Sequence, residues 1–190
     1  MSTPQSKIHN LKSDAGLEFI SGSVEDTQTF GERLGRAVRP GDVVALQGEL
    51  GSGKTTLIQG IARGLGRDPE TIKSPTFVLM REYPGEVPLV HVDGYRLEGV
   101  LAVAALDLDF VFSEHKVTVI EWAERFAGLL PADYLQVYLS HVSANRRRLK
   151  AVGSSARGQR IISQLQLSAA PESTGQPANR PTDSDASSRD

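Results

Sequence analysis

Residues 42–65 read DVVALQGELGSGKTTLIQGIARGL, and this stretch decides the fold. The letters GELGSGKT at residues 48–55 satisfy the phosphate-loop pattern GxxxxGK[ST] at every fixed position. An apolar strand runs into the loop at residues 42–47. An amphipathic helix runs out of it at residues 55–65, with Leu57, Ile58 and Ile61 on its inward face. Strand, loop and helix in this order predict a site for a nucleoside triphosphate.

The residue types in this loop suit the binding of phosphate. Glycine tolerates left-handed backbone, so successive N–H groups can surround a phosphate, and the helix N-terminus adds a partial positive charge. Lys54 is expected to reach the β- and γ-phosphates, and the hydroxyl of Thr55 is expected to become a ligand of Mg²⁺.

Two carboxylates follow apolar strands elsewhere in the chain. Glu121 ends VTVI at residues 117–120, and Asp93 ends LVHV at residues 89–92. At the carboxyl edge of a parallel sheet such acids lie beside the phosphate loop, where they can hold a magnesium-bound water or orient an attacking water. Together with the loop, they favour a hydrolytic site. His91 lies on the same face of its strand as Asp93 and either orients that carboxylate or packs in the core.

The rest of the chain alternates between short apolar runs and helical periods. Ser23 is placed to cap a helix that carries Thr27 and Phe30 on one face, and Pro40 ends that helix. Further helical segments are expected at residues 98–106 and just after residue 121. Strands are expected at residues 17–21, 77–83, 89–93, 134–141 and 147–152, the second and third of these forming a hairpin. This pattern predicts an α/β, P-loop-type three-layer sandwich with a mostly parallel central sheet and antiparallel additions.

Composition and length limit the domain organisation. The chain of 190 residues suits one domain, and we expect a flexible N-terminus at 1–16, a P-loop ATPase domain at 17–152 and a disordered C-terminal tail at 153–190. The state of residues 153–167 is left open. From Ser168 onward the chain has no Leu, Ile, Val, Phe, Tyr or Trp, so it cannot form a packed core.

Cysteine content and charge exclude several classes of protein. The absence of cysteine excludes disulfides, thiolate metal sites and cysteine nucleophiles, and a reducing cytoplasm is the expected location. No window is apolar enough for a membrane span. The net charge of −2 argues against general electrostatic binding of nucleic acid, but residues 134–171 carry six basic side chains and no acidic one. That segment either faces phosphates, a partner or RNA, or it protects a sheet edge by its charge.

Four motifs carry a resemblance to a known family. LGSGKTT at residues 50–56, KSPTF at 73–77, HVDGYRL at 91–97 and IEW at 120–122 resemble, in order and spacing, the signatures of the TsaE (YjeE) family. The resemblance covers roughly residues 21–152. It implies an ATPase that uses ATP or ADP with Mg²⁺. It also implies that this ATPase works with the TsaB and TsaD proteins to form threonylcarbamoyladenosine (t6A) at adenosine 37 of tRNAs reading ANN codons. tRNA would be contacted mainly through the complex.

The resemblance also assigns roles to residues. It implies catalytic roles for Lys54, Asp93 and Glu121, magnesium ligation by Thr55 and Glu121, and a switch-like loop at residues 74–77. The implied nucleotide-binding residues are Thr27, Glu49, Leu50, Gly51, Ser52, Gly53, Lys54, Thr55, Thr56 and Trp122.

The chain departs from the family pattern at two positions. Gly94 stands where a bulky apolar residue is usual, and Ala123 replaces a common proline. Neither position supplies a reacting group, so we expect local flexibility there rather than loss of activity.

Two other functions use a phosphate loop. A small-molecule kinase needs a lid that carries arginines, whereas residues 99–112 are apolar and contain no arginine. A non-catalytic nucleotide-binding adaptor would have no need of the two strand-end carboxylates, Asp93 and Glu121. The leading hypothesis is therefore an ATPase.

Overall fold

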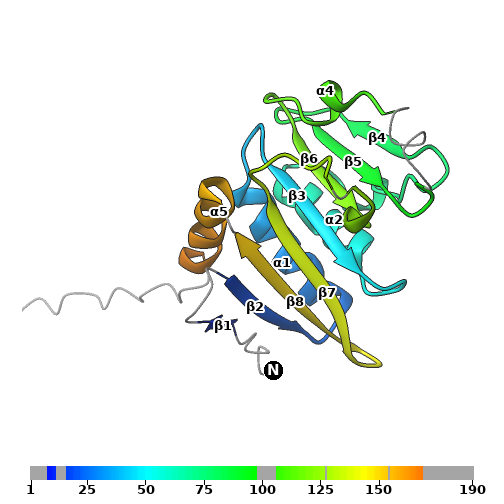
Figure 1. The fold of residues 1–190 in the computed structure, drawn as a ribbon. Helices are drawn as coiled ribbons and strands as arrows, with labels where there is room; N and C mark the ends of the chain where they lie inside the picture. The colour runs from blue at the N-terminus through cyan, green and yellow to red at the C-terminus, as the bar shows by residue number, and fades with distance from the viewer. Residues whose placement is uncertain (1–7, 12–15, 98–105, 127, 154, 169–190) are drawn as a thin grey trace, which may run out of the picture.

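The computed structural model describes residues 8–11, 16–97, 106–126, 128–153 and 155–168. These residues form one eight-stranded sheet with the order β1-β2-β8-β7-β3-β6-β5-β4 (Figure 1). The strands are β1 (Ile8–Leu11), β2 (Gly16–Ser21), β3 (Val43–Gly48), β4 (Met80–Tyr83), β5 (Leu89–Asp93), β6 (Val117–Glu121), β7 (Leu135–Ser143) and β8 (Arg146–Gly153). The helices are α1 (Val24–Ala37), α2 (Lys54–Gly64), α4 (Leu108–Val111) and α5 (Ala156–Leu167), with 3-10 turns η1 (Pro69–Thr71) and η2 (Ala123–Phe126).

The centre of the sheet is parallel. Strands β5, β6, β3 and β7 run in one direction, while β4, β8, β2 and β1 add antiparallel pairs at the two sides. Asp93 at the end of β5 is in register with Glu121 at the end of β6, and Leu46 of β3 is in register with the same glutamate. The predicted α/β class, with a parallel centre of the sheet and antiparallel additions, is confirmed. Both strand-end carboxylates lie at the edge where the phosphate loop leaves β3.

The two faces of the sheet are covered unequally. Helices α1 and α2 lie together behind the sheet in Figure 1, and their apolar side chains pack with those of α5 against one face. The other face of the parallel strands packs against short segments, including Val111 of α4 and Phe126 of η2. The described residues therefore form three layers: the helices α1, α2 and α5, the sheet, and a thin layer of short segments on the other face.

Helices α1 and α2 approach closely because glycines face each other. A methyl group on Gly31 of α1 would come within 2.4 Å of the carbonyl oxygen of Leu57, and one on Gly60 of α2 within 2.2 Å of that of Gln28. Because neither glycine has a side chain, the two helix backbones can touch directly, and this contact fixes the position of α2 and so of the loop at its N-terminus.

The C-terminal region differs from the prediction. Ala156–Leu167 is a helix, α5, whose Ile161, Ile162 and Leu165 are buried in the main core. The expectation of a disordered tail from residue 153 is therefore wrong up to residue 167, because this short segment buries one apolar face against the sheet and α1. Strand β1 likewise gives part of the N-terminal segment a regular structure. The predicted helix at 98–106 falls almost entirely, and the tail beyond 168 entirely, outside the described residues.

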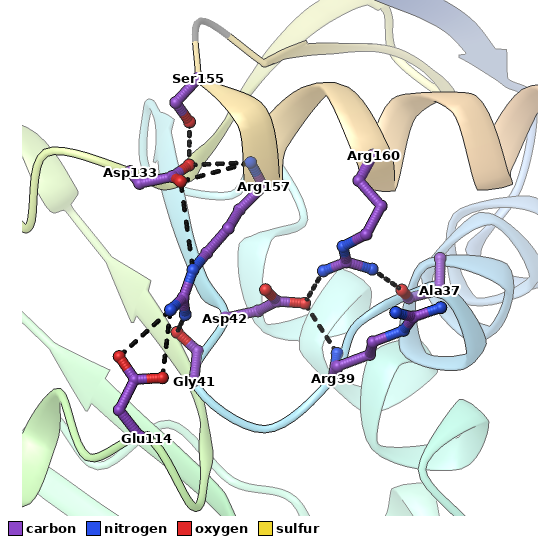
Figure 2. A network of polar contacts seen from close by, with 9 residues as sticks. All are labelled: Ala37, Arg39, Gly41, Asp42, Glu114, Asp133, Ser155, Arg157 and Arg160. Atoms are coloured by element: carbon purple, nitrogen blue, oxygen red, sulfur yellow. Dashed lines mark hydrogen bonds and ion pairs between the residues drawn. The ribbon is translucent and has the colours of Figure 1, made fainter.

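Charged contacts fasten α5 to the loops that precede β3, β6 and β7 (Figure 2). Arg160 of α5 binds buried Asp42, which also accepts a hydrogen bond of 2.7 Å from the backbone N–H of Arg39. Arg157 binds Glu114 at 3.1 Å and lies 4.0 Å from the carboxylate of Asp133. We call these five side chains, Asp42, Glu114, Asp133, Arg157 and Arg160, the α5 clamp.

Strand β8 contains part of the basic segment. It pairs with β2 on one side and with β7 on the other, so it is an interior strand of the sheet. The hypothesis that its arginines protect a sheet edge is wrong. Among the described residues, no helix is long and apolar enough to cross a membrane.

Candidate nucleotide site

The phosphate loop joins β3 to α2 in the conformation that its glycines permit. Gly51 and Gly53 have φ of 75° and 100°, in the left-handed region where other residues are strained. A side chain at either position would meet no atom within 4 Å, so the loop borders open space. Gly53 is the N-cap of α2, which directs the free N–H groups of the first turn toward that space.

Lys54 is buried within the site. Its ammonium donates hydrogen bonds to the carbonyl oxygens of Gly48 at 2.8 Å and Glu49 at 3.0 Å, and it lies 3.8 Å from the centre of the Trp122 ring. Burial lowers the pKa of Lys54, and the nearby negative charges of Glu121, Glu124 and Asp93 oppose this effect. The loop thus holds the cation in place through neutral groups.

Glu121 lies across the loop from α2. Its Oε1 accepts a hydrogen bond of 2.9 Å from the Thr55 hydroxyl and lies 3.0 Å from His91 Nε2. His91 is fully buried, and its Nδ1 has no hydrogen-bond partner among the described residues. The Nε2 atom faces the carboxylate, so it is the ring nitrogen placed to donate a hydrogen bond to Glu121. His91 therefore contacts Glu121 rather than Asp93.

Asp93 is held by the switch-like loop. Its Oδ2 accepts hydrogen bonds of 2.5 Å from both the Ser74 and Thr76 hydroxyls, and its Oδ1 accepts one of 2.9 Å from the backbone N–H of Tyr95. The prediction singled out residues 74–77 as a loop, and the structure shows which atoms fasten it to Asp93.

Two aromatic side chains border the same space. Trp122 adopts a φ of 57°, a strained value for this residue, and its ring lies 5.1 Å from that of Tyr95, centre to centre. Farther out, Phe77 is 83% exposed and lies beneath the guanidinium of Arg96 at 4.3 Å.

Gly94 is more constrained than expected. It is buried, its N–H bonds to the carbonyl oxygen of Glu121 at 2.9 Å, and a side chain there would come within 2.9 Å of the Trp122 carbonyl oxygen. Local flexibility at this position is thus not supported. The glycine allows the turn after β5 to lie against the turn after β6.

A cavity of about 480 Å³ gathers most of the predicted residues. From the loop and α2 it is lined by Leu50, Gly51, Gly53, Lys54, Thr55 and Thr56. From the strand ends and neighbouring loops it is lined by Ser74, Thr76, Asp93, Tyr95, Glu121 and Trp122. We call this the phosphate cavity. Tyr95 belongs to the HVDGYRL motif but was not among the predicted site residues, and the structure adds it to the lining of this cavity.

Three of the predicted nucleotide-binding residues, Thr27, Glu49 and Ser52, do not line the phosphate cavity. Glu49 is exposed and meets Lys54 only through its carbonyl oxygen, while the Ser52 hydroxyl is buried without a hydrogen-bond partner in the described chain. Thr27 is buried in α1, with its hydroxyl 2.7 Å from that of Ser21. It lines a second cavity of about 490 Å³, which shares Gly51, Gly53 and Thr56 with the phosphate cavity.

The oxygen atoms at the site fit Mg²⁺. No group of three or more His, Cys, Asp or Glu side chains in the described residues could hold a metal unaided. Mg²⁺ is commonly bound by one or two protein oxygens together with phosphates and water. The adjacent Thr55 and Glu121 oxygens are such a pair.

Fold and site together define an α/β P-loop protein with a cavity suited to a nucleoside triphosphate. The sequence model of the threonylcarbamoyl adenosine biosynthesis protein TsaE matches residues 21–149. The chain belongs to the TsaE family.

Named relatives and a solved structure agree with this assignment. The TsaE protein of Bacillus subtilis strain 168 is 34% identical over 150 residues, covering 78% of this chain and 93% of its own length. The TsaE protein of Mycobacterium tuberculosis H37Rv is 43% identical over 136 residues, covering 66% and 80%. The crystal structure of Bacillus subtilis YdiB superposes with a TM-score of 0.69 at 30% identity, over 84% of this chain and 98% of that one.

Proposed function

We propose that this protein binds ATP with Mg²⁺ and hydrolyses it in the biosynthesis of threonylcarbamoyladenosine in tRNA. The observation that carries the proposal is the hydrogen bond of 2.9 Å between Thr55 on the loop and Glu121 on β6, with Asp93 beside them in register. The relatives are named tRNA threonylcarbamoyladenosine biosynthesis proteins, which supplies the pathway.

The loop and the start of α2 bind the phosphates in this proposal. The backbone N–H groups at residues 50–56 surround them, and Lys54 exchanges the carbonyl oxygens of Gly48 and Glu49 for phosphate oxygens. Because those carbonyl contacts are neutral, the exchange breaks no ion pair. Leu50, Gly51, Ser52, Gly53 and Thr56 contribute through the backbone or the helix N-terminus, and Glu49 through its carbonyl.

Thr55 and Glu121 would hold the magnesium ion, which neutralises developing phosphate charge when bound. The Thr55 hydroxyl already donates its proton to Glu121, so its oxygen lone pairs are free to face a cation. Trp122 covers Lys54 and keeps that side of the cavity apolar.

Asp93 would orient the attacking water. Its carboxylate is buried and bound to the Ser74 and Thr76 hydroxyls, which come from a loop at the open side of the cavity. A γ-phosphate that meets this loop would change those hydrogen bonds, so Asp93 senses the nucleotide state in this proposal.

The partners follow from the family resemblance. We propose that TsaB and TsaD proteins stimulate turnover, that tRNA is contacted through them, and that the complex works in the cytoplasm. ADP is the nucleotide product of this reaction.

The decisive experiment measures phosphate release from ATP and Mg²⁺, with the chain alone, with TsaB and TsaD, and with tRNA added. Release that requires Mg²⁺ and rises with the partners is expected. Transfer of phosphate to a metabolite would instead indicate a small-molecule kinase, and tight binding without turnover under every condition would indicate an adaptor. Chelation of Mg²⁺ is the matched control.

A further inference from the structure

His91 is a buried polar side chain that the proposed function leaves without a role. It lies in the middle of β5, and neither it nor the flanking Val90 and Val92 exposes any surface. Its Nε2 lies 3.0 Å from Glu121 Oε1, while its Nδ1 has no hydrogen-bond partner within the described ranges. Burying a ring nitrogen without a partner costs stability, and an apolar side chain at this position would avoid that cost. The contact with Glu121 is therefore what an imidazole adds at this position.

The sheet brings His91 to the Glu121 carboxylate. Strands β5 and β6 are parallel, with His91 opposite Val119 and Asp93 opposite Glu121. Because alternate residues of a strand share a face, all four side chains lie on the same face of the sheet. The carboxylate of Glu121 is thus contacted by His91 from the neighbouring strand and by Thr55 from α2.

Both contacts are made to the same oxygen atom of Glu121. The Thr55 hydroxyl donates to Oε1 at 2.9 Å, and His91 Nε2 lies 3.0 Å from that atom. In the part of the chain that the structure describes, Oε2 takes part in no hydrogen bond, and Glu121 lines the phosphate cavity. Two donors on Oε1 restrict rotation of the carboxylate and leave Oε2 as its free acceptor.

We propose that His91 is a positioning residue for Glu121. Its Nε2–H holds the carboxylate so that Oε1 stays on Thr55 and Oε2 stays available to the magnesium ion and its waters. Hydrogen bonds of this kind to a metal-associated carboxylate change metal affinity by about 10- to 100-fold. The inference rests on the proposed function and adds the residue that orients the acid assigned to magnesium. A histidine that only packed in the core would stabilise the fold without any effect specific to magnesium.

The test is titration of ADP by calorimetry, with Mg²⁺ and with EDTA, into the parent chain, His91→Leu and His91→Gln. His91→Leu removes the donor and is expected to reduce the gain in ADP affinity from Mg²⁺ about tenfold, with the affinity in EDTA within about twofold of the parent. His91→Gln carries an amide N–H that can replace Nε2–H and is expected to keep the gain within about threefold of the parent. A full gain in His91→Leu, or an equal loss with and without Mg²⁺, would overturn the inference.

Thr118→Val is the matched control for the loss of a buried hydrogen bond. Thr118 is fully buried on β6, in the parallel part of the sheet, and its hydroxyl donates to the carbonyl oxygen of Val111. Thr118→Val is expected to lower the melting temperature and to leave the gain from Mg²⁺ unchanged. A reduced gain in this control, equal to that in His91→Leu, would trace the effect to a loosened sheet and overturn the inference.

A double-mutant cycle tests whether His91 acts through Glu121. In the Glu121→Gln background, His91→Leu is expected to cause no further loss of the gain from Mg²⁺, because the carboxylate that it positions is already absent. A further loss as large as in the parent background would overturn the inference. His91→Phe, which keeps the bulk of the ring, takes the place of His91→Leu in both experiments if melting curves show that His91→Leu does not fold.

The same titrations separate this inference from the proposed function. A parent chain that binds ADP equally with Mg²⁺ and with EDTA would overturn the magnesium site of the proposed function. A parent chain that shows the gain, together with an unaffected His91→Leu, would overturn only the role of His91.

Discussion

The carboxyl ends of β3, β5 and β6 carry a polar network that differs in kind from the α5 clamp at the amino ends of β3, β6 and β7. In the clamp, each of the three carboxylates meets an arginine. At the candidate site, neither Asp93 nor Glu121 forms an ion pair with a described Lys or Arg. Two further buried atoms there, His91 Nδ1 and Ser52 Oγ, have no hydrogen-bond partner in the described chain.

Backbone strain follows the same division. The two described non-glycine residues with left-handed φ, Leu79 and Trp122, both lie next to the candidate site. In the clamp, every carboxylate is paired with an arginine of the same chain, so the clamp stabilises the fold. At the site, the two carboxylates have no Lys or Arg partner among the described residues and two turns are strained, so these groups can respond to a ligand. Unpaired or strained groups concentrated at one end of a sheet are typical of functional sites.

The largest expected effect comes from Lys54→Ala, with Lys116→Ala as its matched control. Both ammonium groups lie over an aromatic ring, Lys54 over Trp122 and Lys116 over Phe110. Lys116 begins the approach to β6 at the clamp end and pairs with Glu82 at 3.1 Å. Lys54→Ala is expected to reduce ATP turnover at least about a hundredfold because phosphate charge loses its stabilising cation.

In the control, Lys116→Ala is expected to lower the melting temperature, because it removes a partly buried ion pair, and to leave turnover unchanged, because Lys116 lies at the opposite end of β6 from the site. Phosphate release and thermal melting on both variants check the pair. Parental turnover in Lys54→Ala would contradict the phosphate-loop assignment.

Within the site, the two carboxylates are expected to separate by role. Asp93→Asn should spare Mg·ADP binding and reduce partner-stimulated hydrolysis by about 10² to 10⁴-fold, as for loss of a water-orienting group. Glu121→Gln should weaken magnesium-dependent nucleotide binding along with turnover, because Glu121 faces Thr55. ADP titration and phosphate release are measured on each variant. If Asp93→Asn lost ADP affinity and Glu121→Gln kept it, the two roles would be exchanged.

Much of this site follows from local sequence. The run VTVIE at residues 117–121 matches β6 at both ends, and Ser23 caps α1 by accepting a hydrogen bond from the Asp26 N–H. Parallel strands that end in acids beside a phosphate loop suffice to place Asp93 and Glu121 together. These features depend on residues close in sequence or on the general geometry of parallel sheets.

The features that the sequence did not predict depend on contacts between distant segments. Residues 77–79 fit a strand pattern, yet the bonds from Ser74 and Thr76 to Asp93 hold this segment in turns, with Leu79 at a φ of 64°. Helix α5 buries only one apolar face, and its arginines find their partners in loops 24 to 118 positions away. Contacts between segments so far apart leave no pattern in the sequence around either residue.

At the clamp, Asp42→Asn is expected to destabilise the fold by about 2–3 kcal/mol, because it leaves Arg160 without its buried partner. This corresponds to a fall of roughly 5–10 °C in melting temperature for a chain of this size. Glu114→Gln is the matched control in the same network, since Glu114 is largely exposed and should cost less than about 1 kcal/mol. Thermal melting and ADP titration check both. A loss of ADP affinity in a folded Asp42→Asn variant would show that the two ends are coupled.

The smallest effect is expected from truncation after Ser168. Residues 169–190 contain no Leu, Ile, Val, Phe, Tyr or Trp, so their removal takes no large apolar surface from the core, and the melting temperature should change by less than about 1 °C. Ser168 is retained because its hydroxyl accepts a hydrogen bond from Arg33 at 3.2 Å. Truncation after Gly153 is the matched comparison: it removes α5, exposes the core beneath Ile161 and Leu165, and leaves Asp42 without Arg160, so it should prevent stable folding. Melting curves and ADP titration of both truncated chains distinguish the two segments. A drop of several degrees in the shorter truncation would mean that the acidic C-terminal segment packs on the folded body.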